Sequence, residues 1–154
     1  MKRAARILCA LLFAVCLANA HCLAAAPADV LESEYTYIQH GDTGRVLAML
    51  QERLSIDEKD ASEEALFGGE TLSALLAYQR DHVLEETGSF DDATLMLLLG
   101  VSADAEGIDS VIWVPMHGGK KYHDTYECSG MVEPRQMSIA NAKALGFTAC
   151  KKCY

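Results

Sequence analysis

The sequence predicts a mainly α fold, a bundle of three helices, followed by a smaller α+β segment with a β-hairpin and one helix. Between residues 35 and 100, apolar residues recur at helical spacing in three stretches, and no strand-like alternation occurs. Gly-Gly and Gly-Ser pairs separate these stretches as turns. After residue 110 the pattern changes to short β-branched and aromatic runs, which are typical of strands.

The first 20 residues are predicted to be a secretory signal peptide. A positively charged start precedes an apolar run of 12 residues, and Ala18-Asn19-Ala20 forms a small-x-small cleavage site. The run is too short to cross a membrane, and a buried N-terminal helix is the alternative. Cleavage within LAAA, a few residues later, would also remove Cys22. We therefore expect a secreted, cell-wall or periplasmic protein with no membrane span after cleavage.

Charge divides the remaining chain into an acidic and a mildly basic part. Residues 27–111 contain 19 acidic and four basic residues, a net charge of −15, whereas residues 112–154 have a net charge of +3. The stretch 101–110 has no apolar periodicity and is predicted to be a linker between domains at 35–100 and 111–154. The acidic domain is a poor nucleic-acid binder because phosphates require a basic face.

Three helices are predicted in the acidic domain, within residues 42–54, 70–83 and 91–99. Their apolar faces combine residues at helical spacing, namely Val46, Leu47, Leu50 and Leu54 in the first helix and Leu72, Leu75, Leu76 and Val83 in the second. The third helix begins with two carboxylates, which favour the positive end of a helix, and it stops at Gly100.

These stretches resemble the peptidoglycan-binding domain family. HGDTGRVLAMLQERL is similar to the family's opening, a G-D-x-G turn leading into V-x-x-L-Q-x-x-L. FGGETLSALLAYQRDH resembles its second signature, an F-G-x-x-T turn before a helix with an aromatic-Gln pair. GSFDDATLMLLL is similar to its closing G-x-x-D-x-x-T-x-x-x-L. Over residues 35–100, the resemblance implies a bacterial, peptidoglycan-binding-like three-helix domain whose ligand is a cell-wall glycan.

Saccharide sites combine an aromatic face with convergent polar groups, and the resembling stretches offer such residues. The candidates are Asp42, Thr43, Phe67, Thr71, Tyr78, Gln79 and Asp91. Structural roles are the alternatives: Phe67 and Tyr78 in the core, Thr71 and Asp91 as helix caps, and Gln79 on the backbone of a turn. Where the family has an aromatic, glycine-rich loop, this chain has the acidic SIDEKDASEEAL, a departure that bears on sugar binding.

Residues 111–154 are near the size at which a domain needs a metal, disulfides or a partner to fold. VIWV is predicted to be a strand, and KKYH the returning strand of a hairpin. SIANAKALG predicts a short helix with Ser138 as N-cap and Gly146 at its end. The apolar core of this segment is thin, so we expect another interaction to hold it together.

Four residues near the C-terminus have the spacing of a zinc site: His123 and Cys128, then Cys150 and Cys153. Zinc prefers four N or S ligands in a tetrahedron, and a full set of protein ligands leaves no position for catalytic water. We therefore predict structural zinc, with the charge of three thiolates softened by the two intervening lysines. A disulfide among the three cysteines is the alternative in an exported chain, and a thioredoxin-like pair is disfavoured because no βαβ pattern precedes it.

KYHDTYECSGM and AKALGFTACKKC also carry a resemblance. They are similar to small bacterial modules related to the zinc domain of Ada-type DNA-repair methyltransferases, over about residues 112–153. His123 stands where the repair protein has a cysteine, which argues against methyl-acceptor chemistry more than against zinc. Similar domains also occur at the ends of secreted nucleases. The resemblance therefore implies nucleic acid as an alternative partner.

No catalytic motif of the hydrolase, metalloprotease or nucleotide-binding kind occurs in the sequence. The leading hypothesis is an exported, non-catalytic peptidoglycan-binding protein with a structural zinc module. One alternative is an exported protein that interacts with nucleic acid through Lys120, Lys121, Lys143, Lys151 and Lys152. Another is an accessory subunit of a wall hydrolase.

Overall fold

The computed structural model describes residues 35–56 and 65–154, so the predicted signal peptide and most of the acidic loop lie outside the described residues. Residues Tyr35–Tyr154 form one compact unit, which contains the helical stretches and the C-terminal segment. Among the residues that the structure describes, no helix has the length and apolar character needed to cross a membrane.

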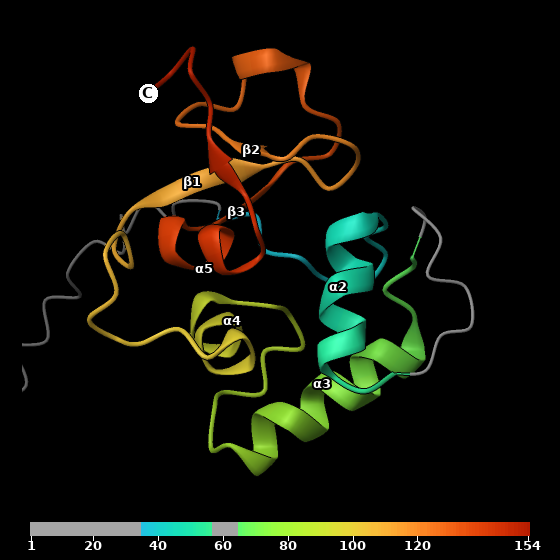
Figure 1. Ribbon diagram of the computed structural model, residues 1–154. Coiled ribbons are helices and arrows are strands. Elements are labelled where there is room, and N and C mark those ends of the chain that lie inside the picture. The colour runs from blue at the N-terminus through green and yellow to red at the C-terminus, as the bar shows by residue number, and fades with distance from the viewer. Residues whose placement is uncertain (1–34, 57–64) are drawn as a thin grey trace, which may run out of the picture. The chain divides into compact units, whose positions relative to one another are not determined.

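Helices and short strands follow one another along this unit (Figure 1). The helices are α2 (Arg45–Arg53), α3 (Gly69–Asp81), α4 (Asp92–Leu99) and α5 (Ile139–Ala144), with a 3₁₀ turn η1 (Cys128–Gly130). The strands are β1 (Val111–Val114), β2 (Lys121–Tyr122), β3 (Arg135–Ser138) and β4 (Thr148–Ala149).

The first two helices lie where the periodicity predicts them, but the buried face of α3 differs from the prediction. α2 buries Val46, Leu47 and Leu50 as expected. α3 buries Thr71, Leu75 and Gln79, whereas Val83 follows the helix and is 93% exposed. The predicted apolar stripe of α3 is therefore wrong in part. The side chain of Thr71 accepts a hydrogen bond from Gln51, and that of Gln79 donates one to Thr94, so these polar residues can occupy the inner face.

The ends of α4 follow the sequence signals closely. Asp91 is the N-cap, and its Oδ1 accepts a hydrogen bond of 2.8 Å from the backbone N–H of Thr94. Gly100 ends the helix in the left-handed conformation. Asp92, the first helical residue, accepts hydrogen bonds from the hydroxyl of Tyr35 and the amide side chain of Asn141. This one carboxylate joins α4 to the N-terminal stretch and to α5.

Two small sheets replace the predicted hairpin. β1 pairs antiparallel with β3, placing Val111 opposite Ser138, and β2 pairs parallel with β4. Only a single antiparallel bridge, between Trp113 and His123, joins the chain segments of the predicted hairpin. Pro115 follows β1 and has no N–H to donate, so the ladder does not continue toward the turn.

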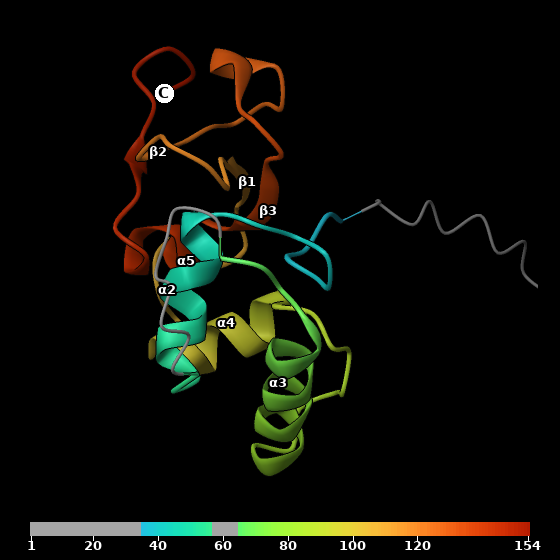
Figure 2. The same cartoon turned by 90° about the vertical axis from the view of Figure 1, so that its right-hand side faces the viewer.

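The prediction of a mainly α, three-helix bundle is wrong: the described residues form a small α+β fold. Their buried apolar residues make one cluster drawn from both halves of the chain, including Ile38, Leu47, Leu50, Phe67, Leu75, Phe90, Leu95, Ile112, Val114, Met116 and Met137. α4 packs against α5, and α5 packs against β1 and β3 (Figures 1 and 2). The helix α4 has only eight residues, and its apolar face is covered in part by α5.

The prediction for the C-terminal helix is confirmed at its start. Ser138 is the N-cap of α5, and its hydroxyl accepts a hydrogen bond from the backbone N–H of Asn141. The predicted linker contacts the start of α5. The carbonyl of Ser110 accepts a hydrogen bond from the N–H of Ile139, and the carbonyl of Gly107 accepts one from the N–H of Ala140.

Gly44 fixes the start of α2 against the segment after β1. Its φ is +131°, and a Cβ at this position would lie 2.5 Å from the carbonyl oxygen of Met116. A residue with a side chain would need both a strained backbone and a displaced neighbour, so only glycine fits.

Replacing Gly44 by alanine should therefore lower the free energy of unfolding by about 2 to 4 kcal/mol, from strain and steric overlap together. Urea denaturation measures the change. Gly69→Ala is the matched control, since Gly69 is helical and a Cβ there meets nothing within 4 Å. It should be neutral or slightly stabilising. Equal stability of the Gly44 variant and the parent chain would contradict this account.

Candidate metal centre

Four side chains converge near the C-terminus: His123, Cys128, Cys150 and Cys153. One ring nitrogen of the histidine and the three sulfur atoms all lie within 4.8 Å of one another. The predicted ligands, drawn from segments up to 30 residues apart, are thus brought together as a group that could hold a metal ion. The cluster confirms the coarser prediction of a metal-binding arrangement.

Two of the separations match the edges of a tetrahedral site. The sulfur atoms of Cys128 and Cys150 are 4.0 Å apart, and Nδ1 of His123 lies 3.8 Å from the sulfur of Cys153. With metal–sulfur bonds of about 2.3 Å, two ligands of a tetrahedron are about 3.8 Å apart. The spacing is therefore compatible with zinc.

Backbone hydrogen bonds place the ligands. His123 exchanges two hydrogen bonds of 2.8 Å with Trp113, which lies in β1. The N–H of Cys150 donates to the carbonyl of Tyr122 at 3.1 Å, just beyond the β2–β4 pairing. A tight turn then brings the N–H of Cys153 within 3.3 Å of the Cys150 carbonyl. Three of the four ligands are thus fixed by β-type contacts or by the turn that follows them.

The fourth ligand comes from a separate turn. Cys128 begins η1, and its N–H donates to the carbonyl of Thr125 at 3.3 Å. Ser129, the next residue, has a left-handed φ of 69°, which bends the chain immediately after the ligand. The bend directs the sulfur atom of Cys128 toward the sulfur atom of Cys150, 4.0 Å away.

The surroundings of Cys150 and His123 favour the protonation states that bind metals. At Cys153, by contrast, a hydrogen bond from the backbone of Asp124 is outweighed by burial and the neighbouring thiols, which raise the pKa of the thiol. The backbone N–H of Lys152 donates to the sulfur of Cys150 at 3.5 Å and, against the effect of burial, lowers the pKa of this thiol to about 7. His123 is 4% exposed, and burial, aided by the charge of Lys152, lowers the pKa of its imidazole. Neutral imidazole and thiolate are the forms that donate electron pairs to a metal.

The three cysteines of the cluster are free, so none of the disulfides considered from the sequence is formed among the described residues. The ring of Trp113 meets that of Tyr126 edge-on at a centroid distance of 5.2 Å, and Tyr122 meets Tyr154 at 5.3 Å. Aromatic packing thus accompanies the backbone contacts of Trp113 and Tyr122 that place the ligands.

The seven candidate glycan-binding residues do not share one surface. Asp42, Phe67, Thr71 and Gln79 are buried. Thr71 accepts a hydrogen bond of 2.8 Å from the side chain of Gln51. Gln79 has the structural role considered from the sequence, since its side chain binds the carbonyl of Ser89 and the N–H of Gly88 in the turn before α4.

The other three candidates are partly exposed but lie in different settings. Thr43 is 3.4 Å from the ring of His117, and Tyr78 stacks on His82 with centroids 4.1 Å apart. Asp91 caps α4 and lines an open hollow of about 350 Å³. The hollow is bounded by Tyr37, Leu84, Glu85, Thr87, Asp91, Asp92 and Ala93.

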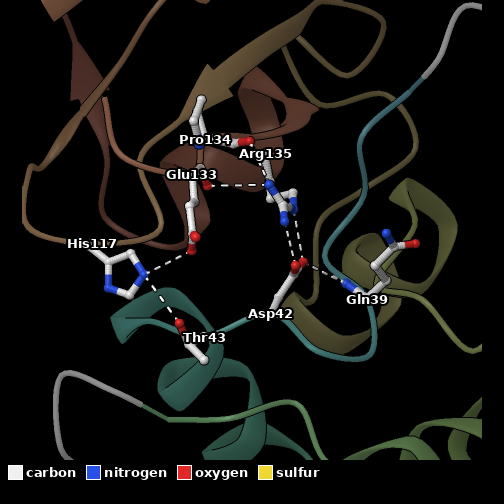
Figure 3. Close-up of polar contacts among 7 residues, drawn as sticks. All are labelled: Gln39, Asp42, Thr43, His117, Glu133, Pro134 and Arg135. Carbon is white, nitrogen blue, oxygen red and sulfur yellow. Dashed lines mark hydrogen bonds and ion pairs between the residues drawn. The ribbon is translucent and has the colours of Figure 1, made fainter. Parts of the chain in front are cut away.

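Asp42 forms an ion pair that the sequence does not predict. The guanidinium of Arg135 donates two hydrogen bonds to its carboxylate, one of 2.8 Å from Nε and one from Nη2 (Figure 3). The backbone N–H of Gln39 donates a third at 2.9 Å. The Asp42 and Arg135 side chains are only 9% and 17% exposed, so the pair is largely removed from water. No sequence signal links two residues 93 positions apart.

The five lysines of the nucleic-acid alternative, Lys120, Lys121, Lys143, Lys151 and Lys152, are all exposed. Lys121 is engaged within the protein, because its ammonium donates to the hydroxyl of Thr148 at 2.7 Å. Exposure alone is the ordinary state of lysine and does not favour a ligand.

Breaking the ion pair should destabilise the protein more than removing both charges. Arg135→Met leaves Asp42 charged and largely buried, and we expect a loss of about 2 to 4 kcal/mol in the free energy of unfolding. Asp42→Asn combined with Arg135→Met should recover part of this loss, because no unpaired charge remains. A double-mutant cycle by urea denaturation measures the coupling, and additive effects would show that the pair contributes nothing.

The chain matches no protein-family model, no curated protein and no solved structure. Its chemistry is therefore inferred from the converging side chains and their surroundings.

Proposed function

We propose that the chain is an exported, non-catalytic binding protein of the bacterial cell wall, and that its C-terminal segment is held by one structural zinc ion. The observation that carries the zinc assignment is the convergence of His123, Cys128, Cys150 and Cys153, whose ligand atoms lie within 4.8 Å of one another. The wall assignment rests on the resemblance of residues 35–100 and on a hollow beside α4.

Zinc suits this ligand set better than other common metals. Three thiolates and an imidazole are soft or intermediate donors, whereas magnesium and calcium prefer oxygen. Four protein ligands complete a tetrahedron and leave no open position for a reacting water, which favours a structural role. A metal ion bound to these four residues would join three segments: the η1 turn, the bridge at His123 and the turn at Cys150–Cys153.

The surrounding structure supports such a role for the ion. β2 and β4 have two residues each, and the cluster lies directly beyond them. So short a parallel pair contributes little stability alone. Metal binding would supply folding free energy to this segment, because the unfolded chain offers no preformed site.

The zinc proposal predicts one zinc ion per chain and dependence of the fold on it. Elemental analysis should give one equivalent of zinc, and a chelator should lower the urea midpoint. Cobalt substitution should give the visible absorption of tetrahedral cobalt bound to thiolates. His123→Ala should weaken zinc retention against a chromogenic chelator by at least about tenfold, as expected for losing one of four ligands.

His82→Ala is the matched control, because His82 is exposed and bonded only to its own helix among the described residues. It should retain zinc like the parent chain. Purified protein with neither metal nor free thiols would overturn the zinc proposal, since it would indicate disulfides in place of a metal site.

The hollow beside α4 has the composition of a saccharide site. Tyr37 supplies a partly exposed aromatic ring, which lies tilted against the ring of Tyr35 at a centroid distance of 4.3 Å. Thr87 and the carboxylates of Glu85 and Asp91 supply polar groups around it. An aromatic face with several hydrogen-bonding groups suits a sugar ring. Asp91 is also one of the residues on which the family resemblance rests.

Wall binding is tested by co-sedimentation of the full chain with purified peptidoglycan at moderate salt. Tyr37→Ala should reduce the retained fraction, with a loss of affinity of about tenfold for removal of one stacked aromatic ring. Tyr126→Ala is the matched control, because Tyr126 is an exposed tyrosine outside the hollow and should leave binding unchanged.

Three outcomes decide the wall assignment. Loss on Tyr37→Ala with retention on Tyr126→Ala supports it. Loss only on Tyr78→Ala would move the site to the exposed side of α3, where Tyr78 stacks on His82. Absence of binding by the parent chain would overturn the assignment and leave the zinc proposal intact, since the two rest on different residues.

A further inference from the structure

A second hollow, of about 210 Å³, lies apart from the metal cluster and from the hollow beside α4. Its lining combines two cationic side chains with an apolar remainder and consists of Arg45, Met49, Lys120, Leu145, Gly146 and Phe147. Residues from α2, from the segment before β2 and from the segment between α5 and β4 meet here, so the hollow exists only in the folded unit.

The two cations of this hollow have no carboxylate partner among the described residues. The ion pairs among those residues are Arg80–Glu86, His117–Glu133 and Asp42–Arg135, and none of them involves Arg45 or Lys120. Arg45 makes one long hydrogen bond of 3.4 Å from Nη2 to the carbonyl of Gly119. Lys120 follows directly in the chain, so two positive groups share one concavity. Their mutual repulsion would be relieved by an anion bound between them.

The position of Lys120 is fixed by the fold. Its carbonyl accepts the backbone N–H of Thr148 at 3.1 Å, a hydrogen bond that belongs to the parallel pairing of β2 with β4. The turn before it depends on glycine, because Gly118 has a φ of +74° and a Cβ on Gly119 would lie 3.3 Å from the ring of Pro115. A cation on a fixed backbone loses less entropy when a ligand binds.

The other side chains that line the hollow are apolar. Leu145 and Phe147 are buried core residues that flank Gly146, and Met49 is partly buried on α2. Such walls do not suit a strongly hydrated dianion such as phosphate, because they offer it no further hydrogen-bond donors. They do suit an apolar group attached to a single negative charge. Arginine, moreover, presents a planar fork that matches a carboxylate.

We propose that this hollow binds a carboxylate-bearing ligand with a short apolar group, such as the C-terminal end of a small peptide. The carboxylate lies between Arg45 and Lys120, and the adjoining apolar group lies against Met49, Leu145 and Phe147. The volume is below the 300 to 1,000 Å³ of pockets that enclose drug-sized ligands, so the hollow accepts a terminal group. This inference goes beyond the proposed function and requires neither zinc nor glycan binding.

The test uses the full exported chain, labelled with ¹⁵N, and three probes of different chemistry. They are N-acetyl-alanyl-alanine with a free carboxylate, the same dipeptide as its C-terminal amide, and inorganic phosphate. The free acid should cause saturable NMR shifts at the backbone amides of Gly119 and Gly146 and at the side-chain Nε of Arg45. The neutral amide should cause none, and phosphate should bind more weakly than the acid.

Variants assign the binding to the two cations. Arg45→Gln and Lys120→Gln should each raise the dissociation constant for the free acid at least about tenfold, as expected for loss of a charge-assisted hydrogen bond. Arg53→Gln is the matched control, because Arg53 lies on the same helix, is exposed and does not line the hollow. Unchanged spectra of the apolar core show that each variant is folded.

Several results would overturn the proposal. Equal binding of the acid and the amide would show that charge is not recognised. Binding of phosphate without binding of the dipeptide acid would show a general anion site with no role for the apolar walls. An equal loss of affinity in the Arg53 variant would show that only net charge matters, and the absence of any shift with the acid would remove the site altogether.

Discussion

The arrangement of the described residues depends on the ion pair between Asp42 and Arg135 (Figure 3). Asp42 lies in the turn before α2, and Arg135 is the first residue of β3. Both charges are largely withdrawn from water, and such a pair is stable only when its hydrogen bonds are well formed. The pair therefore holds one end of β3 against the turn before α2. At the strand's other end, the N–H of Ser138 donates to Asp92 at 3.0 Å, so the same strand is also bound to α4.

A sequence of contacts leads from this strand to the metal cluster. β3 pairs with β1, and Trp113 of β1 exchanges two backbone hydrogen bonds with His123. Displacement of β3 would therefore be transmitted through β1 to the first of the four ligands. The dependence is mutual, because an ion that binds the folded arrangement and not the unfolded chain stabilises every contact that the arrangement requires. The helical half and the half that contains the cluster share one apolar core, so the stability of each half depends on the other.

Local signals in the sequence predict much of this structure, and long-range contacts account for what they miss. The cap at Asp91, the stop at Gly100 and the start of α5 at Ser138 each depend on neighbouring residues, and each is observed. The convergence of the four candidate ligands is predictable because metal-binding residues have recognisable spacings. The prediction of a three-helix bundle is wrong because periodicity shows that a helix has an apolar face but does not show which element covers that face. Here α5 packs against α4. Gln51, Thr71 and Gln79 are buried through mutual or turn hydrogen bonds, which no periodicity reveals.

The net charge of the chain is a poor guide to which ligands its surface accepts. A formal charge of −9 suggests that anions are repelled, yet the described residues form two hollows of opposite character. One is lined by Glu85, Asp91 and Asp92, and the other by Arg45 and Lys120. At physiological ionic strength exposed charges are screened beyond about 8 Å, so the nearest side chains determine the potential in each hollow. Added salt should therefore weaken anion binding beside Arg45, because it screens the charges of Arg45 and Lys120. The distant carboxylates should contribute little to this salt dependence. Binding of a neutral sugar beside Tyr37 should depend much less on salt, because contact and hydrogen bonding supply its affinity.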